Sequence, residues 1–435
     1  MPLQRILSWF GKTGKGPASL PRARGNVETD APPRHEARTV AADSIDEADA
    51  AASDAASAAA ITAEEARRGL LGARRLVIKV GSALIAEGTA PRRLWLRGLA
   101  ADINRWRRNG TQIVIVSSGA VALGQSALGF AGRPERLEDA QAAASIGQLA
   151  LMEAFQHSLK RYDVTAAQLL LTIGDLEDRP RYLNARQTIE ALLARDILPI
   201  VNENDTVATS ELRFGDNDRL AARVAQMAGA DGLLLLSDVD GLYTADPRHD
   251  PGADFLDIVP VITDEIEAMA GPPAVSGLGS GGMVTKVAAA RIAVAAGCTL
   301  AIMNGRSGRP LNRLDRGERA TFFPASGDPL NVRKQWIRGL MAPAGFLHMD
   351  AGALDALKRG ASLLPAGVTD VEGGFARGDL VAFIGADGRL VGQGLSAYSS
   401  GEAGRIRGHQ LSDIPDILGY VGRSALVHRD DLVLF

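Results

Sequence analysis

Two lysines stand where an ammonium group would need an anionic partner. Lys79 lies inside an apolar run at 76–80, directly before Gly81, and Lys286 follows the glycine-rich stretch 277–282 in the first turn of an expected helix. A buried ammonium is costly unless it meets an anion, and glycines let backbone amides approach a phosphate. This pattern favours phosphate binding. The structural alternatives are a strand lysine that reaches solvent and a flexible linker.

Polar residues also gather where apolar runs stop. Ser117–Ala120 follows one run, residues 202–205 (NEND) follow another, and residues 215–218 (GDND) open a predicted helix. The last two clusters together hold four carboxylates and three amides. Helix capping and turn formation could account for one such cluster. Their recurrence favours a polar binding site.

The elements that must position these residues alternate in type along the chain. Apolar, β-branched runs predict strands, and amphipathic segments between them predict helices. Such alternation indicates a mainly parallel sheet covered by helices on both faces, with ligands at the carboxyl ends of its strands. The strands are expected at 76–80, 113–116, 197–201, 232–236 and 300–303, and the helices at 94–108, 185–195, 217–228 and 285–296.

The chain divides into four parts by composition. Residues 1–70 are polar and then Ala/Asp/Ser-rich, and we expect a disordered or low-complexity extension. Residues 71–327 carry the alternating pattern and form the predicted catalytic domain. A linker at 328–342 leads to short strands and turns at 343–435. The predicted fold class is therefore α/β: a three-layer αβα sandwich plus a small, mostly-β C-terminal domain.

Composition excludes several classes of protein. The net charge of −3 argues against a strongly basic nucleic-acid binder, and the single cysteine, Cys298, cannot form an internal disulfide. No apolar run is long enough to cross a bilayer. We expect a cytoplasmic protein that does not bind membranes. The basic segment 1–26 superficially suits an organelle transit peptide, but a bacterial extension is the preferred interpretation.

Taken together, the polar motifs resemble the amino-acid-kinase superfamily and, within it, the glutamate 5-kinase family. The C-terminal part, with Val368, Gly378-Asp379 and 418–420, is similar to a PUA domain. The resemblance runs in order from about residue 74 to the C-terminus. The motifs that carry it are 77–82, 117–120, 202–205, 215–218, 236–247 and 275–286.

The resemblance implies ATP-dependent phosphorylation of the L-glutamate side-chain carboxylate to L-glutamyl 5-phosphate, the first step of proline biosynthesis. That carboxylate has a reference pKa near 4.3, so it arrives ionised and needs no general base. The enzyme must align the reactants and neutralise charge on the transferred phosphoryl group. Lys79 and Lys286 are the expected catalytic cations, with Asp218 orienting both.

The resemblance also implies the binding residues. Lys79, Ser118, Asp205 and Asn217 would hold glutamate, with Asp205 on the α-ammonium group. ATP and Mg²⁺ are the expected cofactors, with Mg²⁺ bridging the ATP phosphates and no dedicated protein metal site. The expected nucleotide-binding residues are Ser237, Asp238, Ser280, Gly281, Gly282, Met283, Val284, Thr285 and Lys286.

Several partners and alternatives stay open at this point. Proline as a feedback inhibitor, a homo-oligomer and handover of product to glutamyl phosphate reductase follow from the resemblance. N-acetylglutamate kinase is the nearest rival activity, although Asp205 suits an ammonium better than an acetamide. RNA binding through the PUA-like domain is the rival of another class. Residues 343–435 hold eight basic and eleven acidic residues, so we do not expect nucleic-acid binding.

Overall fold

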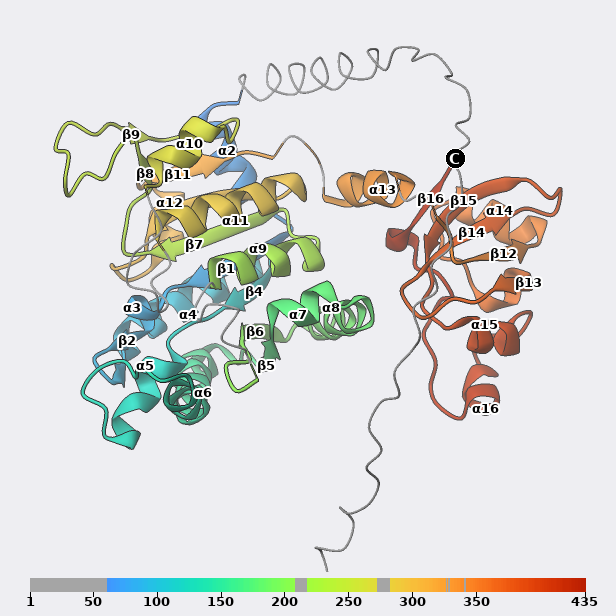
Figure 1. Cartoon of the computed structure of the whole chain (residues 1–435), viewed down its shortest axis with the longest axis horizontal. Helices are drawn as coiled ribbons and strands as arrows, with labels where there is room; N and C mark the ends of the chain where they lie inside the picture. Colours follow the sequence, from blue (N-terminus) through green and yellow to red (C-terminus); the bar gives the residue numbers. More distant parts are fainter. Residues whose placement is uncertain (1–60, 208–216, 272–281, 326, 328, 340–341) are drawn as a thin grey trace, which may run out of the picture. The chain divides into compact units, whose positions relative to one another are not determined.

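A seven-stranded sheet forms the centre of the larger domain (Figure 1). The computed structural model describes residues 61–207, 217–271, 282–325, 327, 329–339 and 342–435. The strand order is β11-β10-β7-β1-β4-β6-β5, and every neighbouring pair is parallel except the antiparallel pair β10–β11. The strands are β1 (Arg75–Val80), β4 (Gln112–Val116), β5 (Ala166–Leu171), β6 (Leu198–Glu203), β7 (Gly232–Ser237), β10 (Thr299–Asn304) and β11 (Ala320–Phe323).

Helices cover both faces of this sheet, which confirms the predicted three-layer α/β sandwich. One face packs on α2 (Ala63–Leu71), α4 (Arg93–Arg108), α6 (Leu137–Leu159) and α12 (Pro310–Asp315); the other packs on α8 (Arg179–Leu193), α9 (Asn217–Ala228) and α11 (Met283–Ala295). Smaller elements are α3 (Ser82–Ile85), β2 (Ala86–Glu87), β3 (Ala90–Pro91), α5 (Ala120–Gly124), η1 (Gln125–Leu128), η2 (Lys160–Tyr162), α7 (Ile173–Glu177), β8 (Leu242–Tyr243), β9 (Phe255–Leu256) and α10 (Asp264–Met269).

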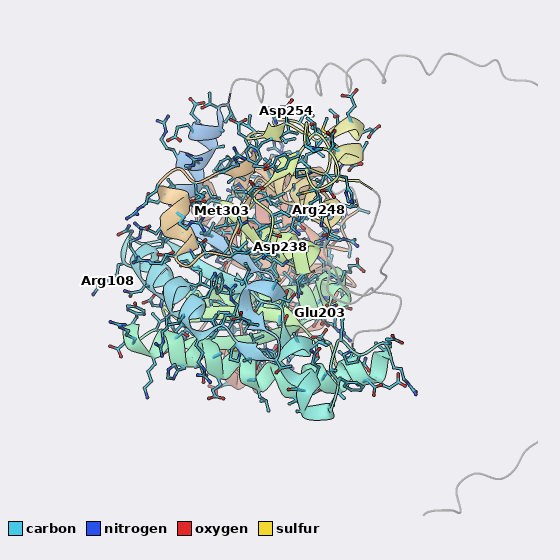
Figure 2. All side chains as sticks on the ribbon, turned by 90° about the vertical axis from the view of Figure 1, so that its left-hand side faces the viewer. Arg108, Glu203, Asp238, Arg248, Asp254 and Met303 are labelled. Atoms are coloured by element: carbon cyan, nitrogen blue, oxygen red, sulfur yellow. The ribbon has the colours of Figure 1, made fainter. Side chains whose placement is uncertain are left out.

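The carboxyl ends of the parallel strands gather the polar residues. In Figure 1, β7 points to the left, and Figure 2 is turned so that this side faces the viewer. The labelled Glu203 ends β6, and Asp238 directly follows β7. In an open parallel sheet this edge is where ligands bind. The fold therefore brings the polar motifs of the sequence to one place.

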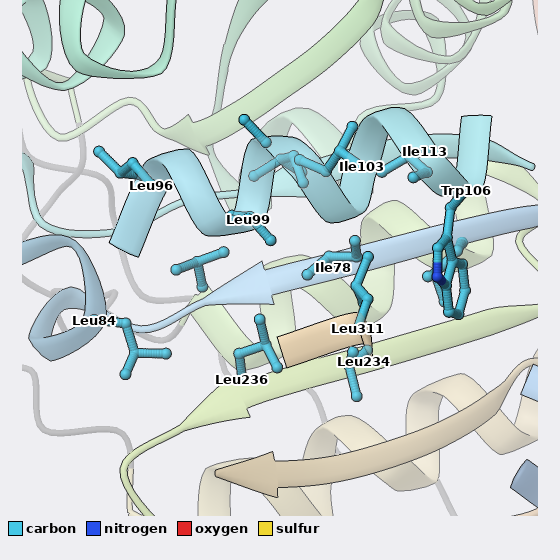
Figure 3. Close-up of a cluster of buried hydrophobic side chains, with 14 of the residues drawn as sticks. Ile78, Leu84, Leu96, Leu99, Ile103, Trp106, Ile113, Leu234, Leu236 and Leu311 are labelled. Carbon is cyan, nitrogen blue, oxygen red and sulfur yellow. The ribbon is translucent and has the colours of Figure 1, made fainter. Parts of the chain in front are cut away.

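Side-chain alternation along the strands explains how two cores form. In β1, Leu76, Ile78 and Val80 face the α4 side, whereas Val77 faces the α9 side. Figure 3 shows the first core, where Leu99 and Ile103 of α4 lie against β1. Successive side chains of a strand point to opposite faces. A strand buried on both faces therefore reads as a continuous apolar run, as the sequence predicted.

Helices α5 and α6 approach each other unusually closely through two glycines. A Cβ atom built on Gly124 would lie 1.9 Å from the Ala143 carbonyl oxygen, and one on Gly147 would lie 1.8 Å from the Ala120 carbonyl oxygen. No side chain larger than hydrogen fits at either position. Gly119, at φ 98°, makes the left-handed turn that leads from β4 into α5. These glycines fix the position of the segment that carries Ser118.

Helix α2 precedes the first strand and belongs to the same core. Thr62 and Glu65 form a reciprocal capping box at its start, and Leu70 is fully buried near Leu76 and Gly232. Arg67 lies over the Phe322 ring at 5.5 Å and donates to the Glu318 carbonyl. The boundary expected at residue 70 thus falls inside a packed helix. Residues 1–60 lie outside the described part of the chain.

The C-terminal domain is built on a second sheet of order β13-β12-β14-β15-β16. Only β12 and β14 pair in parallel, and the other neighbours are antiparallel. Ile337 of α13 (Pro329–Gly339) is buried in a cluster with Leu380, Leu395 and Val433, so part of the expected linker packs on this sheet. The other elements are β12 (Gly345–Met349), α14 (Ala351–Lys358), η3 (Pro365–Gly367), β13 (Val368–Gly373), β14 (Leu380–Ile384), β15 (Leu390–Leu395), α15 (Ser400–Ile406), α16 (Ile414–Leu418), η4 (Arg429–Asp431) and β16 (Leu432–Leu434).

Candidate active site

Lys79 and Lys286 meet on one buried carboxylate, that of Asp218. Lys79 Nζ lies 2.6 Å from Asp218 Oδ1, and Lys286 Nζ lies 3.1 Å from Oδ2. The Asp218 side chain is 1% exposed, so water hardly reaches this group. Three residues that are up to 207 positions apart in the chain, as the sequence numbering shows, therefore form one cluster with a net charge of +1. We call it the lysine–aspartate cluster.

The positions of these three residues follow from the elements that carry them. Lys79 follows Ile78 in β1, so its side chain points to the face covered by α9 and α11. Asp218 lies in the first turn of α9, and Lys286 lies near the start of α11. A carboxylate is favoured at a helix start, whereas a lysine there opposes the helix dipole. Lys286 therefore gains from the adjacent Asp218.

Asp218 is held in its ionised form. Burial alone would raise its pKa, but the ammonium groups of Lys79 and Lys286 overcome that effect and hold the pKa well below its usual range. Thr285 Oγ1 lies 2.9 Å from Asp218 Oδ2 and also 2.9 Å from the Gly282 carbonyl oxygen. Thr285 thus ties the carboxylate to the start of α11. Sequence analysis had placed Thr285 in the nucleotide site without this contact.

Two further predicted residues, Ser118 and Asn217, meet beside this cluster. Asn217 Nδ2 donates to Ser118 Oγ at 2.7 Å. Asn202, which is 1% exposed, donates through Nδ2 to Gln148 Oε1 at 2.7 Å. Within the described ranges, Asn202 Oδ1 and Asn217 Oδ1 are buried without a hydrogen-bond partner. Two acceptor oxygens are thus available to a donor such as an ammonium group.

Asp205 stands in an acidic environment at the same site. Its pKa is raised to about 7, because burial and the nearby Glu203 carboxylate raise it by more than the Arg133 guanidinium lowers it. Glu203 is 9% exposed. Two neighbouring carboxylates in a half-buried place favour a cationic ligand, because a cation would relieve their mutual repulsion. We call Asp205 and Glu203 the acidic pair.

The predicted nucleotide residues divide between described and undescribed positions. Ser237 ends β7 and donates through Oγ to Asp238 Oδ1 at 3.2 Å. Gly282 is the N-cap of α11, and Met283, Val284, Thr285 and Lys286 begin that helix. Ser280 and Gly281 lie outside the described residues. Gly305 N, directly after β10, donates to the Ser237 carbonyl at 2.8 Å and so extends the pairing of β10 with β7.

A pocket of about 420 Å³ joins these groups. Sites for small molecules typically measure about 300–1,000 Å³. No group of three or more His, Cys, Asp or Glu side chains in the described part of the chain is arranged to hold a metal ion. No described helix combines the length and the apolar character needed to span a membrane. The predicted residues that line the pocket are Lys79, Ser118, Asp205, Asn217, Ser237, Asp238 and Lys286.

The fold agrees with the family comparison. The model of the amino acid kinase family matches residues 74–304. The chain belongs to the amino acid kinase family. The PUA domain model matches residues 345–418, so this amino acid kinase carries a PUA domain, as its sequence motifs predicted.

Relatives named glutamate 5-kinase share most of the length of this amino acid kinase. Glutamate 5-kinase from Rhizobium rhizogenes is 54% identical over 370 residues, which cover 85% of this chain and 95% of the relative. Glutamate 5-kinase from Cereibacter sphaeroides is 53% identical over 362 residues, which cover 83% of this chain and 97% of the relative. The match to a solved UMP kinase from Bacillus anthracis covers 59% of this chain and 97% of the UMP kinase at 15% identity, with a TM-score of 0.40.

Sequence analysis missed several lining residues of this amino acid kinase site, among them Asn202, Glu203, Gln125 and Arg133. Asn202 belonged to a recognised motif but was not singled out from it. Gln125 and Arg133 also line the pocket, from η1 and from the loop before α6. Neither lies at the end of a predicted strand, so the rule that located the other residues could not find them.

Proposed function

We propose that the chain phosphorylates the side-chain carboxylate of L-glutamate with ATP and releases L-glutamyl 5-phosphate and ADP. One observation carries the proposal. The two ammonium groups of the lysine–aspartate cluster line the same pocket as the acidic pair. Phosphates need the first feature and a substrate ammonium needs the second. The relatives named glutamate 5-kinase support the same reaction.

The proposed step is a direct transfer. A side-chain carboxylate oxygen of glutamate forms a bond to the γ-phosphorus of ATP, while the bond from that phosphorus to the β,γ-bridging oxygen breaks and ADP takes the electron pair. No proton moves, because the nucleophile is already ionised. Lys79 and Lys286 stabilise the charge on the transferred group, and Asp218 holds both ammoniums in place. This division makes Asp218 a positioning residue.

The remaining lining residues then take separate parts. Ser118, Asn217 and Asp205 bind glutamate, with the α-ammonium on Asp205 and close to the side-chain oxygens of Asn202 and Asn217, which have no hydrogen-bond partner. Ser237, Asp238 and the start of α11 bind ATP; this is the role proposed for Ser280 to Lys286. Mg²⁺ would enter on the ATP phosphates, because it keeps several waters and binds few protein groups. The net positive lysine–aspartate cluster suits those phosphates.

The domain assignment and the cellular setting are part of the same proposal. We assign residues 71–327, together with α2, to catalysis, residues 328–342 to a connection and residues 343–435 to the PUA domain. A cytoplasmic homo-oligomer, inhibition by proline and handover of the labile product to a reductase would fit a first biosynthetic step. Proline would compete in the pocket around Asp205. The role of residues 1–60 is not assigned.

An assay with two substrates tests the proposal. Purified full-length protein, ATP and Mg²⁺ are incubated with glutamate or N-acetylglutamate, and acyl phosphate is trapped with hydroxylamine while ADP is measured. We expect hydroxamate and ADP in equal amounts from glutamate and far less from N-acetylglutamate. The reverse preference would identify an N-acetylglutamate kinase. ADP release without hydroxamate would contradict a carboxylate acceptor.

A further inference from the structure

The pocket holds a third cation besides the two catalytic lysines. Among the described residues that line it, the basic side chains are Lys79, Lys286 and Arg133. Arg133 lies in the loop between η1 and α6, and the residue after it, Pro134, is buried. Arg133 itself remains accessible to solvent. The guanidinium therefore stands at the mouth of the pocket, on a loop anchored by its neighbour.

Arg133 acts on the same part of the pocket as the acidic pair. Its positive charge lowers the pKa of Asp205, in opposition to burial and to Glu203. Lys79 and Lys286, by contrast, both contact Asp218. The pocket thus has one place where two ammonium groups contact a single buried carboxylate, and it is also lined by Arg133 and Asp205, whose charges act on each other. The first place fits a phosphoryl group, and Arg133 with Asp205 fits a group that carries both charges.

The proposed substrate has such a group. At neutral pH, glutamate carries an α-ammonium and an α-carboxylate on the same carbon, in addition to the carboxylate that reacts. With the reacting carboxylate at Lys79 and the ammonium at Asp205, the α-carboxylate still lacks a cationic partner. Glu203 and Asp205 would repel it. Arginine is suited to this task because its planar guanidinium can hold a carboxylate through two parallel hydrogen bonds.

We propose that Arg133 binds the α-carboxylate of the amino-acid substrate, so that Arg133 and Asp205 together recognise the α-amino-acid group. The inference rests on the proposed function and adds a residue that selects the substrate. Arg133 takes no part in phosphoryl transfer itself. Its loss should weaken the binding of glutamate while ATP binding and turnover at saturating substrate remain.

Arg133→Met, which removes the charge and keeps much of the side-chain length, tests the proposal with two controls. Arg133→Lys retains the charge. Arg136→Met removes an exposed arginine from the same loop, one that pairs with Glu138 and does not line the pocket. The hydroxamate assay gives kcat and KM for glutamate and for ATP. Competition assays add two analogues: 4-aminobutyrate, which lacks the α-carboxylate, and glutarate, which lacks the ammonium.

For Arg133→Met we expect kcat/KM for glutamate to fall by about 10- to 100-fold, through KM, because a hydrogen-bonded charge pair is lost. The inhibition constant of glutarate should rise in parallel, and that of 4-aminobutyrate should stay within about twofold. Arg133→Lys should recover part of the loss, and Arg136→Met should match the wild type. The pH midpoint of kcat/KM should move upward in Arg133→Met, because Asp205 loses a neighbouring positive charge.

Two results would overturn the proposal. One is an unchanged KM for glutamate; the other is a loss that appears in the KM for ATP or in kcat instead. If 4-aminobutyrate does not inhibit the wild type, two other readouts decide. They are the change in the KM for glutamate relative to that for ATP, and the pH midpoint of kcat/KM. Failure of the proposed function would look different, because the wild type would then form no glutamyl hydroxamate at all.

Discussion

Two regions of one pocket solve the problem of buried charge in opposite ways. In the lysine–aspartate cluster, Lys79 and Lys286 enclose the carboxylate of Asp218, and all three come from a strand or from the starts of helices. In the acidic pair, Glu203 and Asp205 lie at and just beyond the end of β6, and their repulsion helps raise the pKa of Asp205. In the first region one carboxylate is held between two ammonium groups, whereas in the second two carboxylates lie close together and one of them has a raised pKa.

This difference separates two tasks. A preorganised cluster on rigid elements stabilises a transition state without moving at the moment of reaction. Two adjacent carboxylates, one of them with a raised pKa, gain when a ligand brings a positive charge close to them, so they discriminate between ligands. We therefore expect changes in the cluster to affect kcat and changes near Asp205 to affect the KM for glutamate.

The largest effect is expected from the catalytic lysines. Lys79→Met and Lys286→Met should each lower kcat by about 10²–10³-fold, because each removes a preorganised cation from the transferred phosphoryl group. The hydroxamate assay measures the loss. Lys160→Met is the control. It removes an exposed lysine of η2 that does not line the pocket, and it should retain full activity. A kcat that stayed within a few-fold in both lysine variants would refute their assignment.

The stability of the cluster should depend on its carboxylate. Asp218→Asn leaves two buried ammonium groups without their counter-ion, and we expect a loss of about 3–5 kcal/mol in the free energy of unfolding at pH 7. Urea denaturation measures it. The control is Asp315→Asn, which breaks an exposed pair with Arg105 and should lose about 1 kcal/mol or less.

The same variant should show a specific pH dependence. The pKa of Asp218 is lowered in the folded state, so its contribution is complete above the unfolded-state pKa near 3.9 and is lost as the pH falls below that value. The difference between wild type and Asp218→Asn should therefore be constant from pH 6 to 8 and shrink in acid. A difference that grew in acid would contradict this sign.

Asp205 should control the pH dependence of glutamate binding. Its pKa is raised to about 7, and the ionised form is the one that attracts the α-ammonium. We expect kcat/KM for glutamate to rise with pH through about 7 and to be about tenfold lower at pH 6 than on the plateau. In Asp205→Asn this step should disappear. A step of equal size in that variant would assign it to another group.

The smallest effect on catalysis is expected from the N-terminal segment. Removal of residues 1–60 should leave kcat and both KM values unchanged, since the described domain begins after them.

Leu70→Ala should reduce the free energy of unfolding by about 2–5 kcal/mol, because it leaves a cavity in the core, while kcat and KM stay unchanged. If deletion of 1–60 destabilised the protein as strongly as Leu70→Ala, the core would extend beyond α2.

The sequence predicted the layers well because buried strands leave a clear signal. The apolar run that became β1 and the helix expected at 217–228 match the structure closely. Helix α6 left little trace, because it buries mainly alanine and Gly147 and so shows no strong apolar stripe. The start of α8 was placed too late, although Asp178 and Pro180 are a cap and a first-turn proline.

The site was predictable where it depends on strand ends. Ser118 and Asn217 lie together, and Lys79 meets Lys286 on Asp218, as motif positions at one sheet edge required. Arg133 could not be foreseen, because its place depends on how a loop returns over the pocket. Thr285 could not be assigned to Asp218 for a similar reason: the contact depends on the packing of α9 against α11.

The most direct test compares one residue from each region in the same assay. Initial rates of hydroxamate formation are measured for wild type, Lys79→Met and Asp205→Asn over a matrix of glutamate and ATP concentrations. We predict that kcat falls by at least about 10²-fold for Lys79→Met, an effect larger than any change in its glutamate KM. For Asp205→Asn we predict a raised glutamate KM with kcat largely kept. A raised KM in the lysine variant with kcat unchanged, or a lost kcat in the aspartate variant with KM unchanged, would contradict the division of tasks.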